Sequence, residues 1–317
     1  MELDRYDALS VRGIGDTCFI RERCGDSVVI AFVEGKSLTE LNDVIRASQI
    51  CLKVYDPHSD DSRTSEWMVR LDPRSANKKT EHLLLKMALK PKCITFDCYG
   101  TLVQWHAALE RGVRSILVRR QIAASGSGVP VVEIVDALRR LAMEKQQGPL
   151  YLDYKTILRA SLCEAMTRRG LMPDSQDGDA LLSILRSIPP HPEVPAALQR
   201  LREHFRLAII SNSDDDLISA TVSSLGVPID FVVTAEQAHA YKPDHRLFQH
   251  AHAVIGVSAE ETLHVGMGQV TDLKVCHEMG IRVVWINRLG EALNPDWEPE
   301  AVLPDLGSLP ALLTSSL

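Results

Sequence analysis

The chain has 317 residues, of which 45% are hydrophobic and 24% are charged, as expected of a globular protein with a sizeable core. A formal net charge of −7 argues against nucleic acid or an anionic membrane surface as a partner. The sequence has no run of the ~18 consecutive apolar residues that a membrane-spanning helix needs. Seven cysteines, none of them in a C-x-x-C pair, favour a reducing compartment, so we expect a cytoplasmic protein.

The first 90 residues carry no recognisable catalytic constellation. Short apolar pieces at 27–33 and 50–55 are typical of strands, and residues 38–47 have the pattern of a helix. Two interpretations stay open. Residues 1–90 are either a small accessory domain or an extension ahead of a natural start at Met87, which stands just before the first core strand.

A short strand that ends at a carboxylate organises the rest of the chain. The apolar run 93–96 is β-branched and aromatic, is too short for a helix, and leads directly into Asp97. Ligands of open α/β sheets bind beyond the carboxyl ends of the strands, so Asp97 is expected at the mouth of such a crevice. A carboxylate there can act as a nucleophile. The alternative is an aspartate that only caps the turn through Gly100 and Thr101.

The segment 106–189 has a helical pattern throughout. Its apolar residues recur at three- and four-residue spacing, which is typical of amphipathic helices. They form four groups separated by Gly- and Pro-containing breaks: 109–117, 131–141, 157–166 and 181–185. We therefore predict a four-helix segment that interrupts the chain after the first strand.

After residue 192 predicted helices and strands alternate, which indicates βαβ units. The predicted helices are 194–204, 215–225, 246–255 and 270–279, and the predicted strands are 206–210, 231–234, 263–266 and 283–286. Residues 91–105 and 190–317 should thus form an α/β core, in which helices cover both faces of a parallel sheet.

Polar side chains follow three of these strands and join Asp97 at the same edge of the sheet. The groups are Ser211-Asn212-Ser213, Lys242 in the loop after 231–234, and Asp272 at the end of the segment 266–272. Together they offer a nucleophile, hydroxyl and amide donors, a cation and a second carboxylate around one crevice. Simpler interpretations exist, because Ser211 and Asn212 can cap a helix and Asp272 can stabilise a helix dipole.

In this order the four motifs resemble those of the haloacid dehalogenase superfamily of hydrolases. The motifs are Asp97-Cys98-Tyr99-Gly100-Thr101, Ser211-Asn212-Ser213, Lys242-Pro243-Asp244 and residues 264–272. The tail Trp285-Ile286-Asn287-Arg288 with Asn294-Pro295-Asp296-Trp297 is similar to the L-2-haloacid dehalogenase (type II) branch. The resemblance implies a Rossmann-like parallel sheet with residues 106–189 as an inserted helical cap.

Two positions favour dehalogenation over phosphate-ester hydrolysis. Phosphatases that this chain resembles carry an acid two residues after the nucleophile and an acidic Mg²⁺ ligand near the start of motif four. These positions are Tyr99 and Met267, and a halide leaves carbon without a metal or a proton. No cofactor is therefore expected. The alternatives are a Mg²⁺-dependent phosphatase of a small phosphorylated metabolite and a catalytically weak binding member, the latter suggested by Gly266 and Gly268 in motif four.

The resemblance also implies roles. Asp97 would attack the halogen-bearing carbon of a short 2-haloacid, and water would hydrolyse the resulting ester to a 2-hydroxy acid. Lys242 would keep Asp97 ionised, Asp272 would orient Lys242 or activate the water, and Thr101 would support Asp97. The substrate would contact Cys98, Tyr99, Ser211, Asn212 and Trp105. Arg139 and Arg140 are the candidates for receiving the halide, and a homodimer is the candidate assembly.

Overall fold

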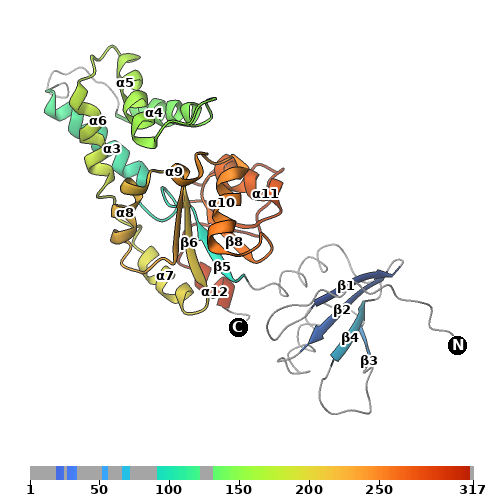
Figure 1. Ribbon diagram of the computed structural model, residues 1–317. Coiled ribbons are helices and arrows are strands. Elements are labelled where there is room, and N and C mark those ends of the chain that lie inside the picture. Colours follow the sequence, from blue (N-terminus) through green and yellow to red (C-terminus); the bar gives the residue numbers. More distant parts are fainter. Residues whose placement is uncertain are drawn as a thin grey trace. The chain divides into compact units, whose positions relative to one another are not determined.

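The computed structural model describes residues 91–121 and 131–314, together with strands within the first 90 residues (Figure 1). The chain divides into two units, Met1–Lys90 and Pro91–Leu317. In the first unit, antiparallel strands pair in the order β1-β2-β4-β3. Their bounds are β1 Phe19–Cys24, β2 Ser27–Val33, β3 Leu52–Tyr55 and β4 Glu66–Leu71. Strands were expected at β2 and β3, whereas the expected helix 38–47 and Met87 lie outside the described residues.

The described part of the second unit is built on a parallel sheet with the strand order β10-β9-β8-β5-β6-β7. Its strands are β5 Cys93–Phe96, β6 Arg206–Ser211, β7 Phe231–Thr234, β8 Thr262–Gly266, β9 Arg282–Ile286 and β10 Ala301–Leu303. Every residue of β5 and β8 is buried, as expected for central strands that are covered on both faces. The predicted α/β class with a parallel sheet is confirmed.

Helices lie on both sides of this sheet (Figure 1). The chain passes from β5 to β6 and β7 through α7 and α8, then returns to β8 and β9 through α10 and α11. Parallel crossover connections are right-handed, so helices lie on one face while strands are added on one side of β5. They lie on the opposite face when strands are added on its other side. Their bounds are α7 Val194–Arg202, α8 Asp215–Ser224, α10 His245–Ile255 and α11 Val275–Met279. Strand β5 lies where the direction reverses, which is where open α/β sheets bind ligands.

The C-terminal part of the sheet differs from the prediction in detail. The predicted helix 270–279 consists of a π-helical turn, η2 Gln269–Lys274, followed by the short helix α11. The spacing of apolar residues over ten positions does not distinguish this wider turn from an α-helix. The short elements β10, α9 Ala235–Ala238 and α12 Leu309–Thr314 were not predicted, because three to six residues carry too little periodicity.

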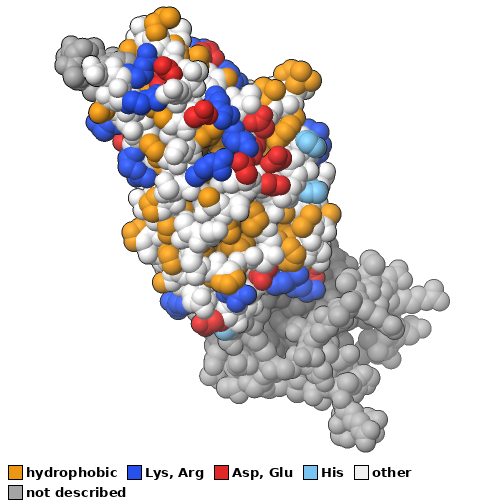
Figure 2. Space-filling view, turned by 60° about the vertical axis from the view of Figure 1, so that its left-hand side comes forward, with side chains coloured by type: hydrophobic (Ala, Val, Ile, Leu, Met, Phe, Trp, Pro, Cys, Tyr) orange, Lys and Arg blue, Asp and Glu red, His pale blue; other side chains and the backbone are white. Residues whose placement is uncertain are grey.

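The segment between β5 and α7 forms helices at the predicted positions. They are α3 Trp105–Arg119, α4 Val131–Gln146, α5 Tyr154–Thr167 and α6 Ser175–Leu185, and α4 packs on α5 while α3 packs on α6. Basic and acidic side chains lie beside one another on the upper part of the face in Figure 2. Exposed ion pairs of these helices include Arg159–Asp179 and Arg168–Glu164. Among the described residues, no helix has the length and apolarity to cross a membrane.

A buried carboxylate joins these helices to the sheet. Asp214, in the loop after β6, is fully buried and accepts hydrogen bonds from the main-chain N–H groups of Tyr154 (2.8 Å) and Lys155 (3.0 Å). These groups belong to the first turn of α5, where unpaired N–H groups and the helix dipole favour an anion. Burial raises the pKa of Asp214, so the hydrogen bonds hold a carboxylate that is otherwise unfavourable there.

We expect Asp214→Ala to destabilise the second unit by about 1–3 kcal/mol, because it leaves two main-chain N–H groups unpaired. Asp216→Ala is the matched control. Asp216 pairs with Lys155 and Arg186 at the surface, where such pairs contribute about 0–1 kcal/mol. Urea unfolding of the two variants tests the difference, and equal losses of stability would contradict it.

Candidate active site

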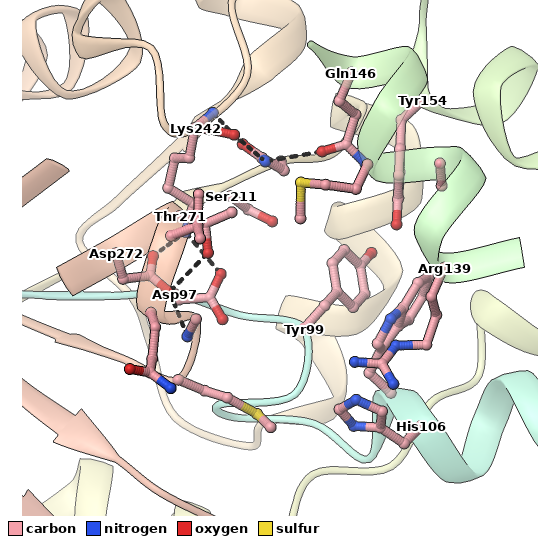
Figure 3. A pocket seen from close by; sticks show the side chains of 18 of the residues that line it. Asp97, Tyr99, His106, Arg139, Gln146, Tyr154, Ser211, Lys242, Thr271 and Asp272 are labelled. Carbon is pink, nitrogen blue, oxygen red and sulfur yellow. Dashed lines mark hydrogen bonds and ion pairs between the residues drawn. The ribbon is translucent and has the colours of Figure 1, made fainter. Parts of the chain in front are cut away.

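A cavity of about 450 Å³ opens at the carboxyl ends of β5, β6 and β8 (Figure 3). The sheet side contributes polar residues, and helices α3, α4 and α5 contribute the opposite wall. Its lining includes Asp97, Tyr99, Trp105, His106, Leu138, Arg139, Met143, Gln146, Tyr154, Leu158, Ser211, Asn212, Lys242, Met267 and Asp272. The motifs predicted from the sequence therefore meet at one cavity.

Lys242 lies between two carboxylates at the base of this cavity. Its Nζ donates to Oδ1 of Asp97 at 2.8 Å and to Oδ1 of Asp272 at 2.6 Å. Only 1% of the side chains of Lys242 and Asp272 is exposed, against 13% for Asp97. Burial alone would lower the pKa of Lys242, but the two carboxylates raise it, so the ammonium stays charged.

Asp272 is held as a carboxylate by several donors. Its Oδ2 accepts the main-chain N–H of Gly268 at 2.8 Å, and its Oδ1 lies 3.2 Å from Nε2 of His264. Burial by itself raises the pKa of Asp272, but Lys242 and His264 outweigh burial and hold it below the ordinary value. His264 is buried, and its Nδ1 lies 2.9 Å from the hydroxyl of Thr95. His264 begins motif four, but no role at the site was predicted for it.

Of these two carboxylates in the cavity lining, Asp97 is the more exposed. Thr101 donates its hydroxyl to Oδ2 of Asp97 at 2.7 Å, while Lys242 occupies Oδ1. Burial raises the pKa of Asp97, and the charge of Asp272 adds to this effect, whereas Lys242 and Thr101 lower it. The cluster thus contains one carboxylate with many donors and one that is less strongly held and turned toward the cavity.

The amide of Asn212 is engaged with protein groups. Its Oδ1 accepts the main-chain N–H of Lys242 at 2.7 Å, and its Nδ2 donates to the carbonyl of Lys242 at 3.1 Å. The same Nδ2 also donates to Oε1 of Gln146 at 3.0 Å. Because both N–H groups of the amide have partners, Asn212 positions Lys242 and offers no free donor to a ligand.

Two buried polar atoms in the cavity lining have no partner among the described residues. They are the hydroxyl of Ser211 and Nε2 of His106. Buried polar atoms are normally hydrogen-bonded, so both are suited to contact a ligand. Burial and the nearby Arg139 lower the pKa of His106 to about 4, which leaves its ring neutral at pH 7. His106 was not predicted as a site residue, because a single histidine near the start of a helix carries no signal.

Aromatic rings form the wall beside Asp97. The rings of Tyr99 and Trp105 lie 4.9 Å apart, and those of Trp105 and Tyr154 lie 6.2 Å apart. The hydroxyl of Tyr99 lies 3.4 Å from that of Thr221. Burial raises the pKa of Tyr99, so it is a poor proton donor to a leaving group.

Of the other predicted site residues, some line the cavity and some do not. Tyr99, Trp105, Ser211 and Arg139 line it. Thr101 is buried and contacts Asp97, whereas Cys98 is buried and is not part of the lining. Arg139 and Arg140 are both exposed on α4, but Arg140 does not line the cavity, since consecutive helical residues point about 100° apart.

A family model described as a haloacid dehalogenase-like hydrolase matches residues 91–280, which is more than half of the chain. The chain belongs to this family. An (S)-2-haloacid dehalogenase from Pseudomonas sp. (strain YL) is 28% identical to this hydrolase over 219 residues, 65% of this chain and 89% of the relative. A phosphoserine phosphatase from Thermus thermophilus is 29% identical over 148 residues, 45% of this chain and 59% of the phosphatase.

The fold is also that of solved dehalogenase structures. The structure of L-2-haloacid dehalogenase from Xanthobacter autotrophicus with chloropropionic acid covalently bound aligns with a TM-score of 0.61 at 21% identity. The alignment covers 70% of this haloacid dehalogenase-like hydrolase and 98% of the Xanthobacter chain. At this identity the likeness supports the fold alone.

The donor set of this haloacid dehalogenase-like hydrolase does not fit Mg²⁺. The ammonium of Lys242 contacts both Asp97 and Asp272, and the second oxygen of Asp272 is taken by Gly268. The position that carries an acidic Mg²⁺ ligand in phosphatases is Met267, and a thioether is a poor ligand for a hard cation. Across the described residues, no group of three or more His, Cys, Asp or Glu side chains could hold a metal ion.

Gly266 explains how Asp272 comes so close to the end of β8. A Cβ atom added at Gly266 would lie 2.6 Å from Cγ and 2.7 Å from Cβ of Asp272. We expect Gly266→Ala to displace Asp272 from Lys242 and to destabilise the unit by about 1–3 kcal/mol. The control is Gly307→Ala, which meets only the flexible end of Asp305. Urea unfolding measures both, and a Gly266→Ala variant as stable as the control would contradict this account.

Proposed function

We propose that this haloacid dehalogenase-like hydrolase cleaves the carbon–halogen bond of short 2-haloacids, through an ester on Asp97, and releases 2-hydroxy acids. The observation that carries the proposal is the way in which the Asp97 carboxylate is held at the cavity. Thr101 and Lys242 hold it toward a cavity in which the positions of a phosphatase's acid and metal ligand are Tyr99 and Met267. This set of residues suits a leaving group that needs neither a proton nor a metal, so the proposed reaction requires no cofactor.

In the first step, an oxygen of Asp97 attacks the halogen-bearing carbon in line with the bond to the halogen. The new carbon–oxygen bond forms as the halide departs with the bonding electrons. Thr101 and Lys242 align the carboxylate without protonating it. The apolar wall of Tyr99, Trp105 and Tyr154 excludes bulk water, which leaves the carboxylate a stronger nucleophile.

In the second step, water attacks the carbonyl carbon of the Asp97 ester. The water oxygen enters the Asp97 carboxylate, and the bond between the ester oxygen and Asp97 breaks. One proton of the water ends on the product hydroxyl, and the other leaves to solvent. Asp272 serves mainly to orient Lys242, because its lowered pKa makes it a weak base.

Substrate binding uses the remaining polar atoms of the lining. The buried, unpartnered hydroxyl of Ser211 is suited to the substrate carboxylate. Arg139, beyond Tyr99 in Figure 3, is the candidate for receiving the halide, and Arg140 is no longer one. Helices α3 to α6 would act as the predicted cap, and α3, α4 and α5 would cover the substrate.

The primary test is halide release from 2-chloropropionate and 2-bromopropionate, with and without EDTA. We expect release by the wild type to survive EDTA and to fall by roughly 10³-fold or more in Asp97→Asn. Asp179→Asn, an exposed carboxylate on α6, is the control and should keep full activity. Release of phosphate from phosphate esters only with Mg²⁺ would support the phosphatase alternative. If neither halide nor phosphate is released from the two substrate classes, the proposal is contradicted.

The pH dependence gives an independent prediction. Only ionised Asp97 attacks, and its raised pKa places the acid limb of kcat/KM above the usual aspartate value of 3.8. Activity is therefore lost as the pH falls through this raised pKa. Lys242→Met removes a positive charge that favours the carboxylate, so it should move the limb to higher pH, and Thr101→Val should move it less. A limb that stays in place in both variants would refute this assignment.

A further inference from the structure

Gln146 connects the helices to Lys242 through one hydrogen-bonded chain. It is the last residue of α4, and its Oε1 accepts from Nδ2 of Asn212 at 3.0 Å. Asn212 holds both the N–H and the carbonyl of Lys242, whose Nζ contacts Asp97 and Asp272. A side chain of α4 is thus three contacts away from the reacting carboxylate (Figure 3).

This chain is complete only when α4 lies in its present position. The Nδ2 atom of Asn212 carries two N–H groups, one for the carbonyl of Lys242 and one for Gln146. If Gln146 moves away, one N–H of the half-buried amide loses its acceptor, and the amide then favours a rotation that restores a partner. Such a rotation would disturb the main chain of Lys242 and with it the Nζ atom.

The surroundings of Gln146 support a coupling role. Gln146 lines the reaction cavity and also a neighbouring cavity of about 410 Å³, so it stands in the wall between them. The loop of Lys242 is fixed to the helices at a second point, where the hydroxyl of Tyr241 donates to the carbonyl of Leu152 at 2.7 Å. Both contacts link the position of the helices to the Lys242 loop.

We propose that Gln146 is a positioning residue that couples the docking of α4 to the placement of Lys242 against Asp97. The effect of Gln146 on catalysis rests on the proposed function, whereas its effect on the pKa of Asp97 does not depend on a substrate. An acceptor atom at position 146 is what the coupling requires. Charge at this position is not required.

The first arm of the test compares three variants in halide release. Gln146→Met keeps the size and removes the acceptor, so kcat should fall about tenfold with KM changed less than about twofold. Gln146→Glu keeps an acceptor and should retain kcat to within about threefold at pH 8, well above the acid limb. Gln147→Met is the matched control, since Gln147 is exposed and lines only the neighbouring cavity. Equal kcat in Gln146→Met and Gln147→Met would overturn the inference.

The second arm needs no substrate and separates this inference from the proposed function. The pKa of Asp97 is measured by carbon-13 NMR of aspartate carboxyls, with Asp97→Asn identifying the signal. In Gln146→Met a less well placed Lys242 should leave Asp97 with a higher pKa than in the wild type, and Gln147→Met should not change it. If the wild type releases no halide, the proposed function fails while this titration still decides the inference. An unchanged Asp97 titration in Gln146→Met would overturn it.

Discussion

The buried ammonium of Lys242 is the constraint on which the site depends. Moving an ammonium out of water costs several kcal/mol unless opposite charges and hydrogen bonds replace the solvent. Asp97 and Asp272 supply these charges. Asp97 directly follows β5 and Asp272 lies in the turn η2 after the neighbouring strand β8, while Lys242 comes from the loop after α9. The cluster therefore requires the carboxyl edge of the sheet to be assembled as observed, and it makes three distant segments of the chain depend on one another.

The same cluster gives its two carboxylates different properties. Asp272 is almost fully buried and accepts from Lys242, Gly268 and His264, so its pKa lies below the ordinary value. Asp97 has fewer donors and stands at the cavity, and burial raises its pKa. One carboxylate thus remains a fixed charge that orients the lysine, whereas the other has fewer donors and a pKa above the ordinary value. A nucleophile needs this second state, because a carboxylate surrounded by strong donors is a weak one.

The sequence predicted the parts of the site that lie on the sheet. Buried strands that end at Asp97 and Ser211 are visible as apolar runs followed by polar residues, and parallel strands bring such ends to one edge. The wall formed by the helices could not be predicted in the same way. Periodicity shows that a helix is amphipathic, but not which residue at its margin faces a cavity, so it could not separate Arg139 from Arg140. It also could not show that Asn212 is fully engaged, because this depends on Gln146 from a distant helix.

Two of the polar links between the helices and the sheet, those made by Asp214 and Gln146, differ in charge, and the difference follows from what lies near each of them. Asp214 meets the first turn of α5, where the helix dipole favours an anion, and it lies outside the lining of the reaction cavity. Gln146 reaches the loop that carries Lys242. An anion there would raise the pKa of Asp97 further, and a cation would compete with Lys242 for the carboxylate. A neutral amide avoids both effects while still offering an acceptor, so it can fix the position of Lys242 without changing the charge that the lysine must balance.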